Sequence, residues 1–150
     1  MDLDLKVVII TGIIAGLLIM ALEPAEIFCW PVDLFFLFIA GIVTVHFMSN
    51  KSGDRLTAAV HGALAGLIAG GFGGVLYNIR KYFDDLQLQA TAGAAYNATY
   101  RKIVGSGTPM TPDQFLVADF LCCLPLLIVT GLVLGAFGGV IYNEVRKVRL

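Results

Sequence analysis

Four long apolar stretches constrain what this sequence can fold into. A helix needs about 20 mostly apolar residues to cross the hydrocarbon core of a bilayer. Every backbone polar group inside that core must be paired within the protein, so long unbroken apolar runs predict helices. The strands of a membrane barrel would instead alternate apolar and polar residues. The sequence therefore predicts an all-α integral membrane bundle of four transmembrane helices, at about residues 5–23, 34–50, 56–79 and 118–143.

The composition points to the same surroundings. Of the 150 residues, 58% are hydrophobic and 14% are charged, against about 25% charged residues in ordinary soluble domains. This composition excludes a disordered chain and a water-soluble domain of this size, which needs more polar surface. The net charge of -1 gives no electrostatic basis for binding nucleic acid. The expected partner is the lipid bilayer.

The connections between the stretches differ in kind. A short polar turn at residues 50–54 predicts that the second and third helices form an antiparallel hairpin. Asp33 precedes the second stretch and is the expected N-cap of its helix. The polar connection at about residues 80–114 carries aromatic and aliphatic residues near helical spacing, which predicts an interfacial amphipathic segment between helices three and four. The sequence from Thr111 to Gln114 has the pattern of a capping box, so the last helix is expected to begin near Pro112.

The distribution of basic residues predicts an orientation. Four spans place both termini on one side of the membrane, together with the turn between the second and third helices. That side carries six Lys or Arg residues, and the long connection carries the other four. Basic residues are enriched on the cytoplasmic side. We therefore expect a multi-pass protein of the cell membrane with both termini in the cytoplasm.

A seven-residue motif occurs twice. Residues 72–78 read FGGVLYN and residues 137–143 read FGGVIYN, and an Arg-Lys pair follows each copy. Because consecutive spans run in opposite directions, the two copies form an elementary inverted repeat, a feature of many transporters. The alternative is that both copies solve one packing problem, with a glycine face, an interfacial tyrosine and a basic pair that reaches the headgroups.

Glycines recur every four residues in three of the four stretches. Residues four apart lie on one face of a helix, and a glycine face lets another backbone approach closely. This spacing predicts a tightly packed bundle, and it favours an oligomer of copies of this chain or an assembly with other membrane subunits. The glycines predicted to pack in this way are Gly12, Gly16, Gly62, Gly66, Gly70, Gly74, Gly131, Gly135 and Gly139.

A few polar residues lie within or beside the predicted spans. Such residues are candidates for a functional site, and here the functional hypothesis is a proton or ion site. The alternative is that they bind backbone or water near the helix ends. His46 and His61 flank the same turn, so they are expected to lie near each other at one membrane face. The candidates are His46, His61, Asp119, Asn78 and Asn143.

The motifs of common enzymes are absent from the sequence. It contains no phosphate-binding loop, no nucleophile elbow and no zinc-protease motif. Its three cysteines, Cys29, Cys122 and Cys123, form neither a disulfide framework nor a C-x-x-C pair. We expect a protein that is not an enzyme and that uses no cofactor or metal.

The hairpin from Phe38 to Gly70 combines an apolar helix, a short Gly/Asp turn and a helix that opens with the pattern G-A-x-A-G-x-x-A-G. In this it resembles small glycine-rich polytopic archaeal membrane proteins of unknown function. The resemblance implies a polytopic membrane fold and an archaeal source. It assigns no functional residue.

Abundant packing signals and few chemical ones lead to a functional expectation. The chain is expected to be a non-enzymatic structural or accessory subunit that packs through its glycine faces in a homo-oligomer or hetero-oligomer. The alternative is a small oligomeric channel or transporter, in which the inverted helix pair and the polar candidates serve transport.

Overall fold

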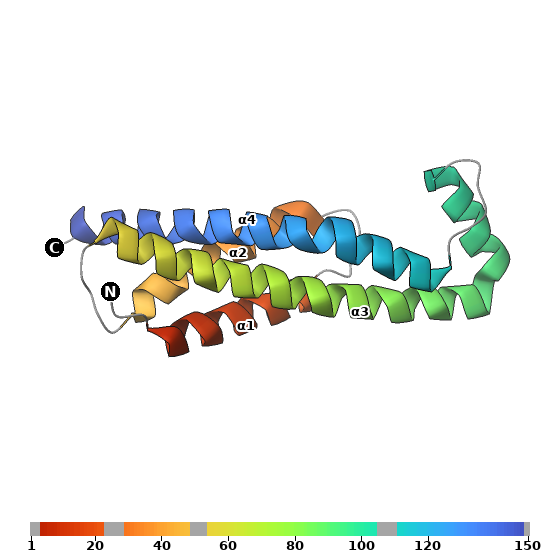
Figure 1. The fold of residues 1–150 in the computed structure, drawn as a ribbon, viewed down its shortest axis with the longest axis horizontal. Coiled ribbons are helices and arrows are strands. Elements are labelled where there is room, and N and C mark those ends of the chain that lie inside the picture. The colour runs from red at the N-terminus through yellow and green to blue at the C-terminus, as the bar shows by residue number, and fades with distance from the viewer. Residues whose placement is uncertain (1–3, 23–28, 49–53, 105–110, 149–150) are drawn as a thin grey trace.

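A computed structural model describes residues 4–22, 29–48, 54–104 and 111–148. These residues form four helices and, within the described ranges, no strand, which confirms the all-α prediction. The helices are α1 (Leu5–Leu22), α2 (Cys29–Phe47), α3 (Arg55–Val104) and α4 (Pro112–Val148) (Figure 1).

A long antiparallel hairpin of α3 and α4 forms the frame of the molecule, and α1 and α2 lie along one part of it (Figure 1). The beginning of α1 and the end of α4 lie at the same end of the bundle. At the other end the α3–α4 hairpin extends beyond α1 and α2. We call this extension the arm, and it comprises α3 from Arg80 onward and the first turns of α4.

Two helices differ from the predicted boundaries. α2 begins at Cys29, so Asp33 lies inside the helix and is not its N-cap. α3 runs as one helix from Arg55 to Val104 and includes most of the predicted amphipathic connection. Its residues 80–92 are mostly good helix formers and include no glycine or proline, so nothing stops the helix after the apolar stretch. The backbone departs from helical geometry at Ala92 (φ −141°, ψ 41°).

Polar caps fix where α3 and α4 begin. The carboxylate of Asp54 accepts hydrogen bonds from the backbone N–H groups of Leu56 (3.3 Å) and Thr57 (3.2 Å). At α4, the N–H of Thr111 donates to the Gln114 side chain (3.1 Å), and the N–H of Gln114 donates to the Thr111 hydroxyl (3.4 Å). This reciprocal pair confirms the predicted capping box and the start of α4 at Pro112.

Two of the helices contain segments long and apolar enough to cross a membrane, at Arg55–Gly93 and Leu116–Val148. The apolar segments of α1 and α2 are shorter, at Leu5–Ala21 and Asp33–Phe47. Among the described residues there are thus two helices of this kind, where the sequence predicts four.

Small side chains fill the centre of the bundle, and large apolar ones lie on its outside. The main buried cluster consists of Ala15, Ile19, Leu37, Ala40 and Ala69. A second cluster of Val45, Met48 and Ala58 lies against Tyr142. The outer faces of α1 and α4 are rich in exposed large apolar residues, among them Ile9, Ile10, Ile14, Leu17, Val129, Leu132, Val133 and Phe137.

Candidate functional site

The backbones of α3 and α4 approach each other closely where their glycines face one another. A Cβ atom added to Gly66 would lie under 3.0 Å from the carbonyl oxygen of Gly131, and one added to Gly131 would lie equally close to that of Gly66. Gly62 and Gly135 have the same reciprocal relation. Since real Cβ atoms essentially never come this close to another atom, only glycine fits at these four positions without a shift of the backbone.

The helices that carry the two copies of the repeat are related at this contact by an approximate two-fold axis. The sequence offset between the copies relates Gly66 to Gly131, and these two residues face each other. The same offset relates Gly62 to Leu127 and Gly135 to Gly70. A two-fold relation therefore predicts that the contact between Gly62 and Gly135 has a counterpart between Leu127 and Gly70. A Cβ added to Gly70 would indeed lie under 3.0 Å from the carbonyl oxygen of Leu127.

The other predicted glycines also face neighbouring helices of the same chain. An added Cβ at Gly12 would lie 2.7 Å from Ile68 of α3, and one at Gly16 would lie 3.0 Å from the Gly73 nitrogen. Gly74 faces leucine side chains of α4, and Gly139 faces the backbone of α3 at its start. All nine glycines singled out by spacing therefore lie at contacts inside the bundle.

Two further glycines make equally close contacts, although the four-residue spacing does not identify them. A Cβ atom added to Gly41 would lie under 3.0 Å from the carbonyl oxygen of Gly135, and one added to Gly138 would lie under 3.0 Å from that of Phe38. Neither glycine has another glycine four residues away, so no periodic signal marks them. Together they bring α2 against α4.

The asparagines of the two repeats lie far apart, Asn78 near the base of the arm and Asn143 near the end of α4. Asn78 and Asn143 are each 2% exposed. Each lies about 18 Å along its own helix from the central glycine pair, and because the helices are antiparallel the two asparagines are about 36 Å apart. Asn78 donates to the Gly74 carbonyl (2.7 Å). They therefore do not form one polar site.

The two histidines have hydrogen-bond partners in different parts of the chain. His46 is exposed, and its Nδ1 hydrogen-bonds to the hydroxyl of Tyr142 on α4 (2.5 Å). His61 is fully buried. Its Nε2 accepts from the backbone N–H of Asp4 (3.1 Å), and its Nδ1 donates to the Thr57 carbonyl (2.7 Å). Because a backbone N–H only donates and a carbonyl only accepts, these partners place the proton of a neutral imidazole on Nδ1.

The remaining polar candidates give no metal site within the described part of the chain. No group of three or more His, Cys, Asp or Glu side chains there is arranged to hold a metal ion. Cys122 and Cys123 are exposed on α4 and are not in a disulfide. Asp119 belongs to α4, but its side chain lies outside the described set, as does that of Cys29.

An ion-pair cluster joins the start of α3 to the end of α4. Arg55 donates to both carboxylate oxygens of Glu144, through Nε (2.8 Å) and Nη2 (3.0 Å), and Lys147 donates to one of them (3.0 Å). The hydrogen bond from Arg55, followed by that from Lys147, lowers the pKa of Glu144 to about 2. The pKa of Asp54 beside it is also lowered, first by the hydrogen bond from the Thr57 hydroxyl and then by the capped N–H groups.

Polar contacts also hold the base of the arm. The hydroxyl of Tyr82 donates to Asp113 (2.8 Å), and this hydrogen bond raises the pKa of Tyr82. Arg80 donates to the carbonyl of Met20 (3.1 Å) and so ties the end of α1 to α3.

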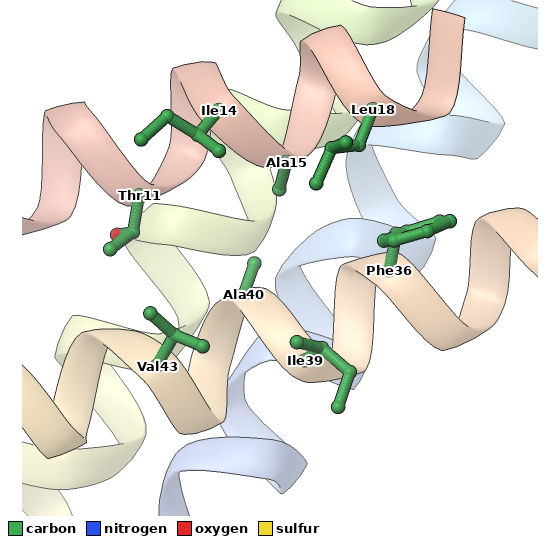
Figure 2. Close-up of a pocket in the computed structure, with 8 residues that line it drawn as sticks. All are labelled: Thr11, Ile14, Ala15, Leu18, Phe36, Ile39, Ala40 and Val43. Atoms are coloured by element: carbon green, nitrogen blue, oxygen red, sulfur yellow. The ribbon is translucent and has the colours of Figure 1, made fainter. Parts of the chain in front are cut away.

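An apolar cleft of about 120 Å³ separates α1 from α2 (Figure 2). Ala15 and Ala40 point toward each other across it. The hydroxyl of Thr11 lies at one end, where it bonds to the Val7 carbonyl (2.7 Å) and to the Thr44 hydroxyl (2.6 Å). The lining residues are Thr11, Ile14, Ala15, Leu18, Phe36, Ile39, Ala40 and Val43.

A second cavity, of about 30 Å³, lies between α2 and α4 and contains the one buried acidic side chain of the described core. Asp33 is 8% exposed there. Sequence reasoning missed this residue, because its position before an apolar stretch is typical of an N-cap. The signal that could have found it is the apolar sequence on both sides, from Cys29 to Val32 and from Leu34 onward.

Several of the described polar side chains thus connect one helix to another by ion pairs or hydrogen bonds, and others cap the starts of α3 and α4. This arrangement can hold a bundle together, and it leaves the Asp33 cavity as the one place where a buried acidic group faces open space in the described residues. No protein-family model, curated protein or solved structure matches this chain.

Proposed function

We propose that this chain is an integral membrane protein whose four helices lie in the bilayer, and that it serves as a structural or accessory subunit. The observation that carries the proposal is the distribution of side-chain size. The inner faces of the helices carry glycine and alanine, whereas the outer faces of α1 and α4 carry large apolar side chains. Water would disfavour that outer surface by about 25 cal/mol per Å², and lipid would not.

Helix dimensions support this placement. α1 has 18 residues and α2 has 19, which corresponds to about 27 Å and 28 Å of helix and lies within the range that crosses a bilayer. The asparagines and the tyrosines beside them mark the base of the arm and the opposite end of the bundle, about 36 Å apart. Tyrosines and basic residues favour the headgroup levels of a membrane.

The arm supports an accessory function. Beyond Arg80, α3 continues for about 18 Å before it bends at Ala92. Phe83 and Leu88 are exposed on it (63% and 46%). All nine predicted packing glycines are used inside the bundle. Contacts with copies of the chain or with larger subunits would therefore use the arm and the outer face of α4.

Transport is the second candidate function. The observation that favours it is the two-fold relation between the repeats, because inverted repeats build the substrate sites of many transporters. A pore or transporter also needs polar groups that face a shared cavity. The larger of the two cavities described above is lined by apolar residues apart from Thr11, so the accessory function is the better supported of the two.

Alkaline carbonate extraction of cell membranes tests the membrane location. A chain that is embedded through four helices stays in the pellet after the wash, as lipid-embedded proteins do. Release of the folded chain into the supernatant would contradict the proposal.

Native mass spectrometry after gentle solubilisation distinguishes the two functions. An accessory subunit is expected to co-purify with a larger membrane protein in defined stoichiometry. A homo-oligomer that mediates solute flux when reconstituted in liposomes would support transport instead. A lone monomer without flux would contradict both assembly proposals.

A further inference from the structure

A buried carboxyl group faces the smaller of the two cavities, between α2 and α4. Asp33 is 8% exposed and lines a space of about 30 Å³ together with Leu34, Leu126, Leu127 and Thr130. No hydrogen bond or ion pair joins its carboxyl group to another residue in the described part of the chain. Buried carboxylates usually have such partners, because burial of an unpaired charge is costly.

The cavity of Asp33 lies beside an apolar part of α4. Leu126 to Thr130 lie within about 8 Å, along the helix axis, of Gly131 at the centre of the α3–α4 contact. If the four helices cross a bilayer as proposed, this places Asp33 inside the hydrocarbon region, about 6 Å along α2 from its first residue, Cys29. An ionised carboxylate within the hydrocarbon region is disfavoured.

Among the described residues that line the cavity, none carries a charge that would offset this penalty. The cavity is lined, apart from Asp33, by three leucines and a threonine. On α4 the nearest titratable groups are the thiols Cys122 and Cys123, which do not line it. On α2 the other titratable residues are His46 and Cys29, and the side chain of Cys29 lies outside the described set. The sequences 7–22 of α1 and 62–76 of α3 contain no titratable side chain.

The chemistry of the lining favours a proton over a metal ion. Calcium takes six to eight oxygen ligands and magnesium about six, whereas the cavity offers one carboxyl group and one hydroxyl. The hydroxyl of Thr130 donates to the Leu126 carbonyl (2.7 Å), so its oxygen remains able to accept. The space is also large enough for one water molecule, which needs about 15 Å³.

We infer that Asp33 is an intramembrane proton-binding site, whose carboxyl group carries a proton while α2 packs against α4. The inference rests on the proposed membrane location. On release, the carboxyl O–H bond breaks, the proton passes to a water molecule that has entered the cavity, and the electron pair stays on the carboxylate. Deprotonation therefore requires water between α2 and α4, and it weakens that contact.

Infrared spectroscopy of the full chain in phosphatidylcholine vesicles tests the inference. At neutral pH we expect the C=O stretching band of a protonated carboxyl group, and we expect Asp33→Asn to remove it. Asp33→Glu keeps a carboxyl group and should restore the band at a shifted frequency. Thr130→Val should shift the band of the wild-type chain, because it removes the hydroxyl in the cavity. Asp54→Asn, which changes an exposed capping carboxylate, is the matched control and should leave the band unchanged.

A hydrophobic carbodiimide gives an independent readout. Its central carbon bonds to the oxygen of a protonated carboxyl group while the O–H bond breaks and the proton moves to a nitrogen of the reagent. The acyl group then migrates from that oxygen to nitrogen to give an N-acylurea, with no leaving group. We expect one reagent per chain on the peptide that contains Asp33, no such product in Asp33→Asn, and less labelling as the pH rises.

The outcomes separate this inference from the membrane proposal. A chain that resists carbonate extraction but lacks the band and the labelling at neutral pH would overturn the proton site and leave the membrane location intact. A chain released by carbonate would overturn the membrane location directly. Resistance to extraction, together with a band that only the Asp33 variants alter, supports both.

Discussion

The α3–α4 contact and the α1–α2 contact bury the same kind of small residue with different results. Between α3 and α4, glycines allow the backbones to touch, and an added Cβ at Gly66 or Gly131 would have no room. Between α1 and α2, Ala15 and Ala40 face each other across a cleft of about 120 Å³ (Figure 2).

The difference shows that small residues alone do not produce close packing. In the α3–α4 contact the glycines of two antiparallel helices match in position, so each fits the backbone of the other. In the α1–α2 contact Leu18 and Phe36 line the cleft beside the alanines, so larger side chains surround a gap. The direct link there is the hydrogen bond between Thr11 and Thr44.

Substitution in the α3–α4 contact should have the largest effect. Gly135→Leu places a large side chain where even a Cβ would lie under 3.0 Å from the Gly62 carbonyl oxygen. We expect a loss of at least about 3 kcal/mol in the free energy of unfolding in detergent, since overpacking must move the backbone. The matched control is Gly93→Leu, because an added Cβ at Gly93 has nothing within 4 Å. Equal thermal stability of the two variants would contradict the close-contact account.

Removal of the threonine hydrogen bond should have a smaller effect on the α1–α2 contact. Thr44 is fully buried, and Thr44→Val should cost about 1 kcal/mol. A double-mutant cycle with Thr11→Val measures the coupling between the two hydroxyls, which we expect to be about 0.6 kcal/mol, as for similar pairs in membranes. A coupling energy of zero would show that this bond does not hold the two helices together.

Filling the cleft should stabilise the bundle slightly. Ala40→Val adds carbon atoms at the cleft, and we expect a gain of about 0.5 kcal/mol. Ala69→Val is the matched comparison, because Ala69 is fully buried and does not line the cleft. There the same change should destabilise by about 1 kcal/mol or more. Thermal melts that show the same sign for both substitutions would mean that the cleft is closed in solution.

Acid should weaken the ion-pair cluster of Arg55, Glu144 and Lys147, and this is the smallest of the expected effects on stability. The pKa of Glu144 is lowered in the folded chain from an ordinary value of 4.5 to about 2, so its stabilising contribution is present above pH 4.5 and is lost as the pH falls toward 2. The lowered pKa of Asp54 acts in the same direction. Melting temperatures between pH 5 and pH 2 should fall less steeply for Glu144→Gln than for the wild-type chain. Identical slopes would show that the ion pairs do not contribute.

The sequence predicts the helices well because its local signals are strong. Apolar stretches, the capping box at Thr111 and the glycines four residues apart correspond to helices, a cap and interhelical contacts in the structure. The sequence predicts the amphipathic connection as a separate segment, but its residues continue α3, because residues 80–92 are mostly good helix formers.

The candidate site was less predictable, because it depends on contacts between helices. Asp33 looks like a cap in sequence, and only the longer α2 and the packing of α4 show it as a buried carboxyl group beside Thr130. The two histidines are close in sequence to the same turn, yet their hydrogen bonds lead to Asp4 and Tyr142. Sequence neighbourhood does not specify which partner helix a side chain meets.

Tryptophan quenching in vesicles tests most directly the central claim that the bundle lies in a bilayer and the arm outside it. With Trp30 replaced by phenylalanine, a single tryptophan is placed either at Val129 or at Phe83, which are similarly exposed (61% and 63%). We predict that Val129→Trp is quenched by lipids brominated near the ends of their acyl chains and not by iodide in water, and that Phe83→Trp shows the reverse. Quenching of both by iodide, with no effect of the brominated lipids, would contradict the account.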